Sequence, residues 1–237
     1  MAGREVRTMT QLAVVIGGQG GIGAALVDAL EQQGHADRVI NLSRQSEPPI
    51  DFTDLASVER AASWLAAQPG EIRLVIDATG FLHDGHFTPE RSLRDLNAEH
   101  MGKAFLINAI GPAIVMQHIL PLLPRDGRAV FATLSARVGS IADNRLGGWH
   151  SYRASKAALN QLVRGAAIEL ARRRKDAVCV ALHPGTVDTP LSRPFSKSGL
   201  DVRPASQAAV EILAVIDGLT AADSGGFFDN KGEPIAW

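Results

Sequence analysis

The sequence predicts an α/β protein of the Rossmann type, a doubly wound parallel sheet in a single domain that spans residues 1–237. Short apolar runs alternate with segments of helical periodicity, which is typical of a parallel sheet covered by helices. A glycine-rich turn follows the first apolar run, where a dinucleotide-binding fold places one. With 237 residues, of which 46% are hydrophobic, the chain can build one well-covered core.

The predicted elements follow one another in a regular order. Residues 12–16 are an apolar run too short for a helix, and apolar residues at helical spacing then occupy 22–33, up to the stop signal Gly34. Further strands are predicted at 38–43, 72–78, 128–135 and 178–183, with a short last one near Phe227. Further helices are predicted at 54–67, 97–123, 151–173 and 205–216. Right-handed crossovers between these strands would cover both faces of the sheet.

Two segments lie outside this alternation. Residues 1–10 form a polar leader without the charged-then-apolar pattern of a secretory signal. Residues 189–204, which are rich in Ser, Arg and Pro, form the longest irregular stretch. Loops of that length in compact domains are commonly lids or binding segments, so we expect this one to be the substrate loop.

Charge and cysteine content narrow the function classes. Lys plus Arg total 24 against 25 for Asp plus Glu, which offers no sequence-wide basic footprint for nucleic acid or an anionic membrane. No uninterrupted apolar run approaches the roughly 20 residues that cross a bilayer. The single cysteine, Cys179, can form no intrachain disulfide, which favours a cytoplasmic location. We therefore expect small-molecule partners, no nucleic acid and no membrane.

The glycine turn is the predicted nucleotide site. Gly17, Gly21 and Gly23 are spaced Gly-x-x-x-Gly-x-Gly between the first strand and first helix, with Ile22 inside the motif. Residues without a Cβ atom let the backbone approach a pyrophosphate, and the helix N-terminus holds it with free N–H groups and a positive dipole end. A glycine-rich turn without ligand is the alternative, but the position after a predicted strand favours nucleotide binding.

The end of the second strand indicates which nucleotide is bound. Many NAD-binding chains place an acidic residue there on the ribose 2′-hydroxyl, whereas this chain has Ser43 and Arg44. The planar donor fork of arginine suits a 2′-phosphate, so NADP(H) is favoured over NAD(H), with a solvated surface arginine as the alternative. Asp51 and Phe52, near the next strand end, could cap the adenine or simply fill a loop.

Tyr152 and Lys156 are the predicted catalytic pair. They are four residues apart in a predicted helix, which places both on one face, and Tyr152 is the only tyrosine. A phenol with a pKa of about 10 is a poor acid or base near neutrality, but an adjacent ammonium and an oxidised nicotinamide would lower that pKa. Tyr152 then becomes a usable general acid or base. A Tyr-x-x-x-Lys pair also arises by chance, so the surrounding residues matter.

Other polar and flexible positions converge on the same edge of the sheet. Ser135 ends the strand that begins near 128, at the edge where ligands of open α/β sheets bind. Asn108 lies in the long helix just before Pro112, which bends a helix axis and leaves carbonyls free. The loop that leaves strand 178–183 can meet the nicotinamide with its backbone, and it contains Pro184, Gly185, Val187 and Thr189.

These motifs together resemble the short-chain dehydrogenase/reductase family, from about Leu12 to the C-terminus. The resemblance is carried by the glycine turn at 17–23, by Asn108, by Tyr152 with Lys156, and by the Pro-Gly step of the loop after strand 178–183. Within the family, residues 139–160 are similar to the C-factor and sniffer-like carbonyl reductases, a subgroup that includes signalling members.

The resemblance implies a role for each site residue. Tyr152 would protonate the carbonyl oxygen as hydride arrives from the nicotinamide, and Lys156 would bind the ribose hydroxyls and lower the tyrosine pKa. Ser135 would hydrogen-bond the substrate oxygen, and the backbone of Asn108 would hold a water that links the lysine to solvent. Thr189 and the backbone near Gly185 would fix the nicotinamide carboxamide.

Three positions depart from the family pattern. Ile16 stands where a threonine usually precedes the first glycine, and the usual Asn-Asn-Ala-Gly is Asp-Ala-Thr-Gly at 77–80. The usual two serines after the fifth strand, of which the second is catalytic, are Ser135 and Ala136. We therefore expect Ser135 or Ser140 to supply the catalytic hydroxyl.

An alternative function and an assembly also follow from the resemblance. Ala136 and the signalling members of the subgroup indicate the alternative, a nucleotide-binding signalling or regulatory protein with little turnover. The family implies a homodimer or homotetramer, formed through the long helices that contain Asn108 and Tyr152. His83 and His86 are expected to be loop residues that bind no metal, because a metal site needs further converging ligands.

Overall fold

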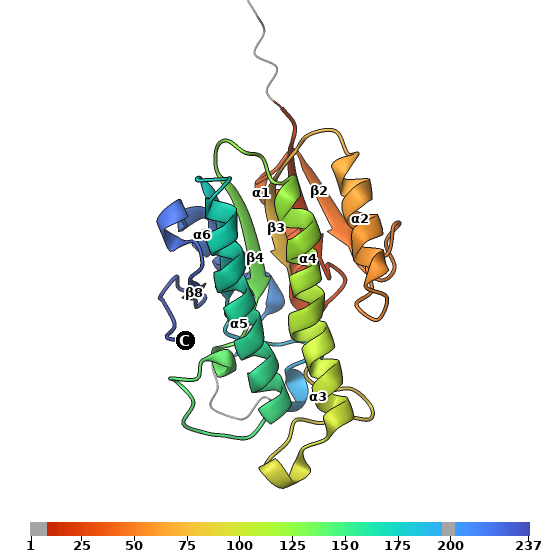
Figure 1. The fold of residues 1–237 in the computed structure, drawn as a ribbon, viewed down its shortest axis with the longest axis vertical. Helices are drawn as coiled ribbons and strands as arrows, with labels where there is room; N and C mark the ends of the chain where they lie inside the picture. The colour runs from red at the N-terminus through yellow and green to blue at the C-terminus, as the bar shows by residue number, and fades with distance from the viewer. Residues whose placement is uncertain (1–8, 196–201) are drawn as a thin grey trace, which may run out of the picture.

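The computed structural model, which describes residues 9–195 and 202–237, confirms the Rossmann-type single domain (Figure 1). Six parallel strands lie in the order β2-β1-β3-β4-β5-β8. Their bounds are β1 (Gln11–Ile16), β2 (Arg38–Leu42), β3 (Glu71–Asp77), β4 (Ala129–Leu134), β5 (Ala177–Leu182) and β8 (Phe227–Phe228). A separate pair, β6 (Thr186–Val187) and β7 (Val202–Arg203), lies beyond the carboxyl end of β5.

Helices cover both faces of the six-stranded sheet (Figure 1). They are α1 (Gly21–Gln33), α2 (Ala56–Ala66), α3 (Ala98–Phe105), α4 (Gly111–Ile119), α5 (His150–Ala171) and α6 (Ala205–Gly218). One core contains apolar side chains of α2, α4 and α5, and the other contains those of α1 and α6. Successive residues of β1 point into the two cores in turn, Leu12 and Val14 into one and Ala13 and Val15 into the other. Burial on both faces explains why the strands read as continuous apolar runs.

The predicted long helix over 97–123 is interrupted by a wider turn. A π-helical turn, Leu106–Ile110, joins α3 to α4, and a short 3₁₀ turn, Leu120–Leu122, ends the segment. Pro112 has no N–H to donate to the carbonyl of Asn108, four residues earlier, so the regular α-helical bond is lost at this point. Turns of this kind are frequently found at functional sites, and here the turn carries a predicted site residue.

This helical segment, Ala98–Leu122, is long and apolar enough to cross a membrane by length and composition alone. Lys103 and Asn108 interrupt it, so it contains no uninterrupted apolar run of that length. The core helix of a soluble protein has the same properties, and here Val115, Met116 and Ile119 pack into the core beside the sheet. In this fold the segment therefore packs as a core helix beside the sheet.

The strand order reverses at β1, which pairs with β2 on one side and with β3 on the other. In open α/β sheets, ligands bind outside the carboxyl ends of the strands at such a switch point. The glycine turn leaves β1 at this edge, and the loops after β3, β4 and β5 leave from the same edge. Residues 1–8 of the polar leader and 196–201 of the predicted substrate loop lie outside the described residues.

Candidate active site

The glycine turn has the conformation that its residues were expected to allow. Gly17 has a φ of 80°, a left-handed value that favours glycine, and its carbonyl accepts a hydrogen bond from the Gly20 N–H at 2.9 Å. A Cβ atom on Gly23 would lie 2.2 Å from that same carbonyl oxygen. Gly20 precedes α1 without a side-chain cap, and the first turn has no acidic residue. The N–H groups at this helix end are therefore available to an anion.

The loop after β5 packs directly on this turn. A Cβ atom on Gly21 would lie 2.8 Å from Thr189 Cγ2, so only a glycine fits between the loop and the helix. Gly185 has a φ of 79°, which turns the chain away from β5. The predicted contact residues of the two segments line one cleft, namely Ile22, Pro184, Gly185, Val187 and Thr189. The structure thus brings these predicted residues together.

The end of β2 presents an arginine beside the glycine turn. Ser43 is buried, and its hydroxyl accepts a hydrogen bond from the Gln45 N–H at 3.1 Å, which shapes the turn after the strand. Arg44 is exposed, and no ion pair is recorded for it among the described residues. Asn41 was not assigned a role from the sequence, yet its Oδ1 would lie 2.3 Å from a Cβ atom on Gly18. Its only sequence signal is its place in the strand that ends at the nucleotide edge.

The two residues expected at the adenine differ in their placement. Asp51 is partly buried, and its Oδ1 accepts hydrogen bonds from the N–H and the hydroxyl of Thr53 at 2.9 and 2.8 Å, which lower its pKa. Phe52 is buried in the core, with its ring against Gly111 of α4. The Phe52 ring is thus used in core packing, whereas the sequence left open an adenine contact or a loop position.

Tyr152 and Lys156 lie one turn apart on α5, as predicted, but the chain alone does not lower the tyrosine pKa. Removal of the phenol from solvent raises the pKa of Tyr152 to about 12. Lys156 Nζ donates to the carbonyl oxygen of Leu134 at 2.7 Å. Burial lowers the pKa of the ammonium to about 8, although the negative charge of Asp77 acts to raise it. The expected lowering of the tyrosine pKa therefore needs a further positive charge.

Asn108 holds the loop after β3 against the catalytic helix. Its Oδ1 accepts from the Phe81 N–H at 2.7 Å, and its Nδ2 donates to the Phe81 carbonyl at 2.7 Å and to Ser155 Oγ at 3.0 Å. The side chain is fully buried, and these bonds use both of its N–H donors. The backbone carbonyl of Asn108 lacks its regular helical donor, because Pro112 has no N–H.

The structure distinguishes the two candidate serines. Ser135 lines the cleft beside Tyr152, and its hydroxyl donates to Asn160 Oδ1 at 2.7 Å. Ser140 is buried outside the cleft lining, and its hydroxyl accepts from the Asp143 N–H at 3.1 Å. Of the two, only Ser135 lines this cleft.

Asp77 provides the polar bracing of the sheet that the family places elsewhere. Its Oδ2 accepts from the Thr133 hydroxyl of β4 at 3.0 Å, and its Oδ1 accepts from the Thr79 hydroxyl at 2.7 Å. The side chain is fully buried, and this burial raises its pKa in spite of the hydrogen bonds. Asp77 and Thr133 therefore connect β3 to β4 directly below the site.

Glu90 is a site residue that the sequence analysis missed. Its buried carboxylate accepts hydrogen bonds from the hydroxyl and, at 3.2 Å, the N–H of Ser151, in the first turn of α5. Its backbone carbonyl accepts from the Trp149 N–H at 2.6 Å. Glu90 thus caps the helix that carries Tyr152 from a distant segment. No local sequence pattern announces such a cap, because the partners are 61 residues apart.

The cleft has a volume of about 390 Å³, and aromatic side chains line one side of it. The Trp149 ring contacts both Tyr152 and Phe195 edge-on, with ring centroids 6.2 and 5.4 Å apart. Phe195 and Leu191 belong to the described part of the predicted substrate loop, and both line the cleft. The structure thus brings this loop to the predicted catalytic residue.

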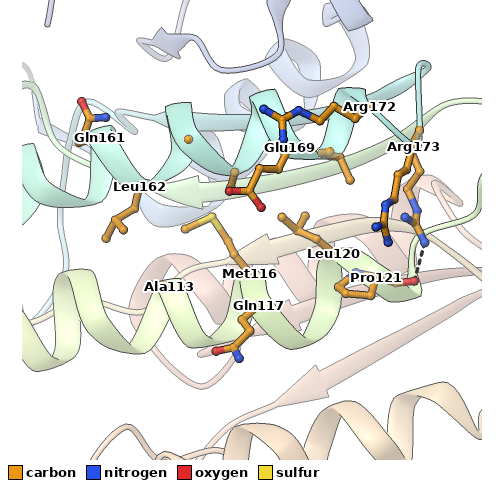
Figure 2. Close-up of a pocket in the computed structure, with 14 residues that line it drawn as sticks. Ala113, Met116, Gln117, Leu120, Pro121, Gln161, Leu162, Glu169, Arg172 and Arg173 are labelled. Carbon is orange, nitrogen blue, oxygen red and sulfur yellow. Dashed lines mark hydrogen bonds between the residues drawn. The ribbon is translucent and has the colours of Figure 1, made fainter.

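His83 Nε2 lies 3.1 Å from the Leu191 carbonyl oxygen and so joins the loop after β3 to the substrate loop. Within 9–195 and 202–237, no group of three or more His, Cys, Asp and Glu side chains is arranged to hold a metal ion. A larger hollow of about 730 Å³ lies between α4 and α5, away from the site, as Figure 2 shows.

Comparison with known proteins places this site in a family. A family model described as Enoyl-(Acyl carrier protein) reductase matches residues 17–214. C-signal of Myxococcus xanthus is 39% identical over 146 residues, which cover 62% of this chain and 84% of that protein. The 1-hydroxy-2-glutathionyl-2-methyl-3-butene dehydrogenase of Rhodococcus sp. (strain AD45) is 33% identical over 192 residues, 81% of this chain and 80% of that protein.

Solved structures agree with this result at the level of the fold. Carbonyl reductase Sniffer of D. melanogaster matches with a TM-score of 0.81 at 22% identity, over 97% of this chain and 100% of that chain. An NADPH-bound carbonyl reductase from chicken fatty liver matches with a TM-score of 0.81 at 24% identity, over 97% and 94%. With the family match over most of its length and the expected motifs gathered at one edge of the sheet, the chain belongs to the short-chain dehydrogenase/reductase family.

Proposed function

We propose that this oxidoreductase transfers a hydride between NADP(H) and a carbonyl or alcohol substrate, with Tyr152 as the general acid or base. The observation that carries the proposal is the arrangement of the cleft. The phenol of Tyr152 lines it, Lys156 lies one turn further along the same helix, and the uncapped end of α1 lies beside the loop at Thr189. The Rhodococcus relative, a dehydrogenase of a hydroxylated compound by its name, supports the same reaction type.

The choice of NADP(H) is supported by Arg44. Its exposed guanidinium follows β2, at the position where dinucleotide-binding folds recognise the ribose 2′ group, and no described carboxylate lies within ion-pair distance of it. Its planar donors suit a phosphate. Two similar solved structures are described as NADPH-bound or NADP-bound, which supports the same cofactor for this fold.

The residues of the cleft fit this cofactor and divide the work. When bound, the nicotinamide would supply or accept the hydride, and its oxidised ring would add a positive charge that favours the phenolate of Tyr152. Tyr152 gives its proton to the carbonyl oxygen during reduction and removes it during oxidation. The Lys156 ammonium holds the ribose hydroxyls and stabilises the phenolate, and Ser135 hydrogen-bonds the substrate oxygen. Thr189 and the backbone near Gly185 orient the carboxamide.

The helix turn around Asn108 supports a path for the proton. Both N–H donors of its side chain are used, and its backbone carbonyl has no regular helical donor, because Pro112 lacks an N–H. We propose that this carbonyl holds a water between Lys156 and solvent, so that the proton lost from Tyr152 is replaced from outside.

We also propose that the chain forms a homodimer or homotetramer through α4 and α5. The hollow between these helices is lined by apolar side chains such as Met116, Leu120 and Leu162, with charged residues at one end (Figure 2). Leu162 and Ile168 of α5 are 38% and 48% exposed, whereas Leu159, Val163 and Leu170 of the same helix are buried. A second copy would cover this face.

One observation favours the second candidate function, a nucleotide-binding signalling or regulatory protein with little turnover. Ala136 lines the cleft where the family usually places the catalytic serine, and C-signal is among the similar proteins. Replacement of Tyr152 by Phe separates the two functions. If Tyr152→Phe folds but the biological activity is lost, the oxidoreductase function is supported. If the biological activity is unchanged, the regulatory function is supported.

Nucleotide binding tests the proposed function directly. Purified protein is titrated with NADPH and with NADH, followed by nicotinamide fluorescence, for the unmodified chain and for Arg44→Ala. The matched control is Arg38→Ala, an exposed arginine at the amino end of β2. Tighter NADPH binding that disappears only in Arg44→Ala supports the proposal. No binding of either nucleotide at millimolar concentration contradicts it.

A further inference from the structure

The substrate end of the cleft holds more positive than negative charge. Its charged lining residues are three arginines, Arg137, Arg145 and Arg153, and one aspartate, Asp143. His183 also lines the cleft, but its burial and the nearby Arg137 lower its pKa to about 4, so it is neutral at pH 7.

One of the three arginines already has carboxylate partners. Arg137 Nη2 donates to Asp229 Oδ2 at 3.1 Å, and its Nη1 lies 3.5 Å from Asp143 Oδ2. Asp143, the one carboxylate of the lining, therefore pairs with Arg137, which Asp229 also neutralises. The positive charge of the cleft then comes from the other two arginines.

Those two arginines bind only backbone carbonyls within the described part of the chain. Arg145 Nη1 donates to the carbonyls of Ala142 and Asn144 at 2.8 and 3.3 Å. Arg153 Nε donates to the carbonyl of Gly148 at 3.0 Å, and neither guanidinium lies within 4.0 Å of a carboxylate there. A neutral carbonyl satisfies a donor but does not cancel a charge. Asp143 acts on Arg153 from beyond ion-pair distance, but it is shared with Arg137, so the lining keeps a net positive charge.

Aromatic and aliphatic side chains form one wall of the cleft. Trp149 has a φ of 51°, a left-handed value that is rare for a bulky residue, and its N–H bond to the Glu90 carbonyl holds it there. The indole consequently faces Phe195, with Leu82 and Val138 among the other lining residues. Such a wall suits a flat, apolar body placed next to Tyr152.

Arg145 and Arg153 do not belong to the proposed nucleotide site. Neither comes from the glycine turn or from the end of β2, where the pyrophosphate and the 2′-phosphate are proposed to bind. Arg145 comes from the loop before α5, and Arg153 follows Tyr152 on the helix itself. They therefore face the part of the cleft that the substrate occupies.

We propose that the natural substrate is a carbonyl or alcohol compound with an aromatic or apolar body and a carboxylate, which Arg145 binds with support from Arg153. This inference rests on the proposed function, since it concerns the same cleft. Arg145 makes the direct contact with the carboxylate, because its side chain is exposed and its hydrogen bonds go to carbonyls of its own loop. Arg153 holds the loop backbone and adds to the positive potential.

A pair of aldehydes that differ in one charge tests the proposal. Reduction of 4-formylbenzoate and of its methyl ester is followed by NADPH oxidation for the unmodified chain, Arg145→Met, Arg145→Lys and the control Arg38→Met. The ester group withdraws electrons more strongly than the carboxylate, so a preference for the acid has to come from the protein. We expect kcat/KM for the acid to be about tenfold higher than for the ester, a typical effect of one charge-assisted contact.

The variants show where that preference arises. Arg145→Met should remove the preference by lowering kcat/KM for the acid alone, Arg145→Lys should retain part of it, and Arg38→Met should retain all of it. Equal use of acid and ester by the unmodified chain, or an unchanged preference in Arg145→Met, would overturn the proposal.

A binding measurement separates this proposal from the proposed function. Calorimetric titration with 4-(hydroxymethyl)benzoate and with its methyl ester needs no turnover, and it is made with and without NADP⁺. Tighter binding of the acid that weakens in Arg145→Met and at high salt supports the anion site even if neither aldehyde is reduced. Equal binding of acid and ester overturns the anion site even if the enzyme reduces both aldehydes.

Discussion

Ser135 Oγ donates its proton to Asn160 Oδ1 at 2.7 Å, so this buried hydroxyl of the cleft lining is directed toward α5. The Nδ2 of Asn160 is buried and has no hydrogen-bond partner among the described residues. A half-turn of the amide would let Nδ2 donate to Ser135 Oγ instead, which satisfies the buried nitrogen and frees the serine proton for a substrate oxygen. The two residues therefore act as a unit.

Ser135 rather than Ser140 should support turnover. We expect Ser135→Ala to lower kcat by about 10- to 100-fold, because a donor to the developing charge on the substrate oxygen is lost. Ser140→Ala should leave kcat within about twofold while it lowers Tm, since it removes a single buried hydrogen bond of about 1 kcal/mol. Steady-state kinetics and thermal unfolding of both variants measure this. A large loss of kcat in Ser140→Ala alone would reverse the assignment.

The cap that Glu90 provides for α5 should make stability depend on pH. Burial raises the pKa of this carboxyl, but the hydrogen bonds from Ser151 and the nearby His100 outweigh it, so the pKa is lowered overall. A lowered pKa means that the stabilisation is present above the unfolded pKa of about 4.3 and is lost as pH falls through the folded value. Glu90→Gln should therefore destabilise the protein by about 1–3 kcal/mol at pH 7.

Urea unfolding at pH 7 and at about pH 3.5 measures this contribution. The difference between the unmodified chain and Glu90→Gln should shrink at the lower pH, where the carboxylate is progressively protonated. Glu31→Gln, an exposed position on α1, is the matched control and should change stability by less than about 0.5 kcal/mol at either pH. A Glu90→Gln effect that does not vary with pH would contradict the role of the charge.

Activity should fall as Lys156 loses its proton. Burial lowers the pKa of this ammonium to about 8, and the negative charge of the neighbouring Asp77 partly offsets this by raising it. Asp77→Asn removes that charge, so the alkaline limb of kcat/KM should move to lower pH. The exposed control Asp54→Asn should leave the limb in place. A shift of the limb to higher pH in Asp77→Asn would show that the carboxyl does not stabilise the ammonium.

Steric contact in the glycine turn should make Gly23 irreplaceable. A Cβ atom there would lie 2.2 Å from the Gly17 carbonyl oxygen, so Gly23→Ala should distort the turn and abolish nucleotide binding. Gly102→Ala on α3 adds a Cβ with nothing within 4 Å and should stabilise the helix by up to about 1 kcal/mol. NADPH titration and thermal unfolding compare the two. Retained NADPH affinity in Gly23→Ala would contradict the cradle.

Assembly through α4 and α5 should be sensitive to charge at their shared face. Gly165 lines the hollow of Figure 2, and a side chain added there meets nothing in the same chain within 4 Å. Gly165→Arg should therefore give a folded monomer, while Gly102→Arg should keep the assembly. Light scattering after size-exclusion chromatography measures the mass. An unchanged mass for Gly165→Arg would place the interface elsewhere.

Much of the fold and part of the site could be predicted because their signals are local. Strands, helices and the glycine turn are encoded by short periodic patterns, and the spacing of Tyr152 and Lys156 alone places both on one face of α5. The position of Arg44 after β2 and the approach of the loop at Thr189 to the turn also follow from element order in a parallel sheet.

By itself, then, the sequence determined the order of elements and the edge of the sheet where the site lies, since both depend on neighbours along the chain. Only the tertiary structure decided which partner each side chain takes. Ser135 turns to a residue 25 positions away, Glu90 caps a helix 61 positions away, and the ring of Phe52 packs on Gly111. Burial likewise set the direction of the Tyr152 pKa, because desolvation depends on every segment that closes the cleft.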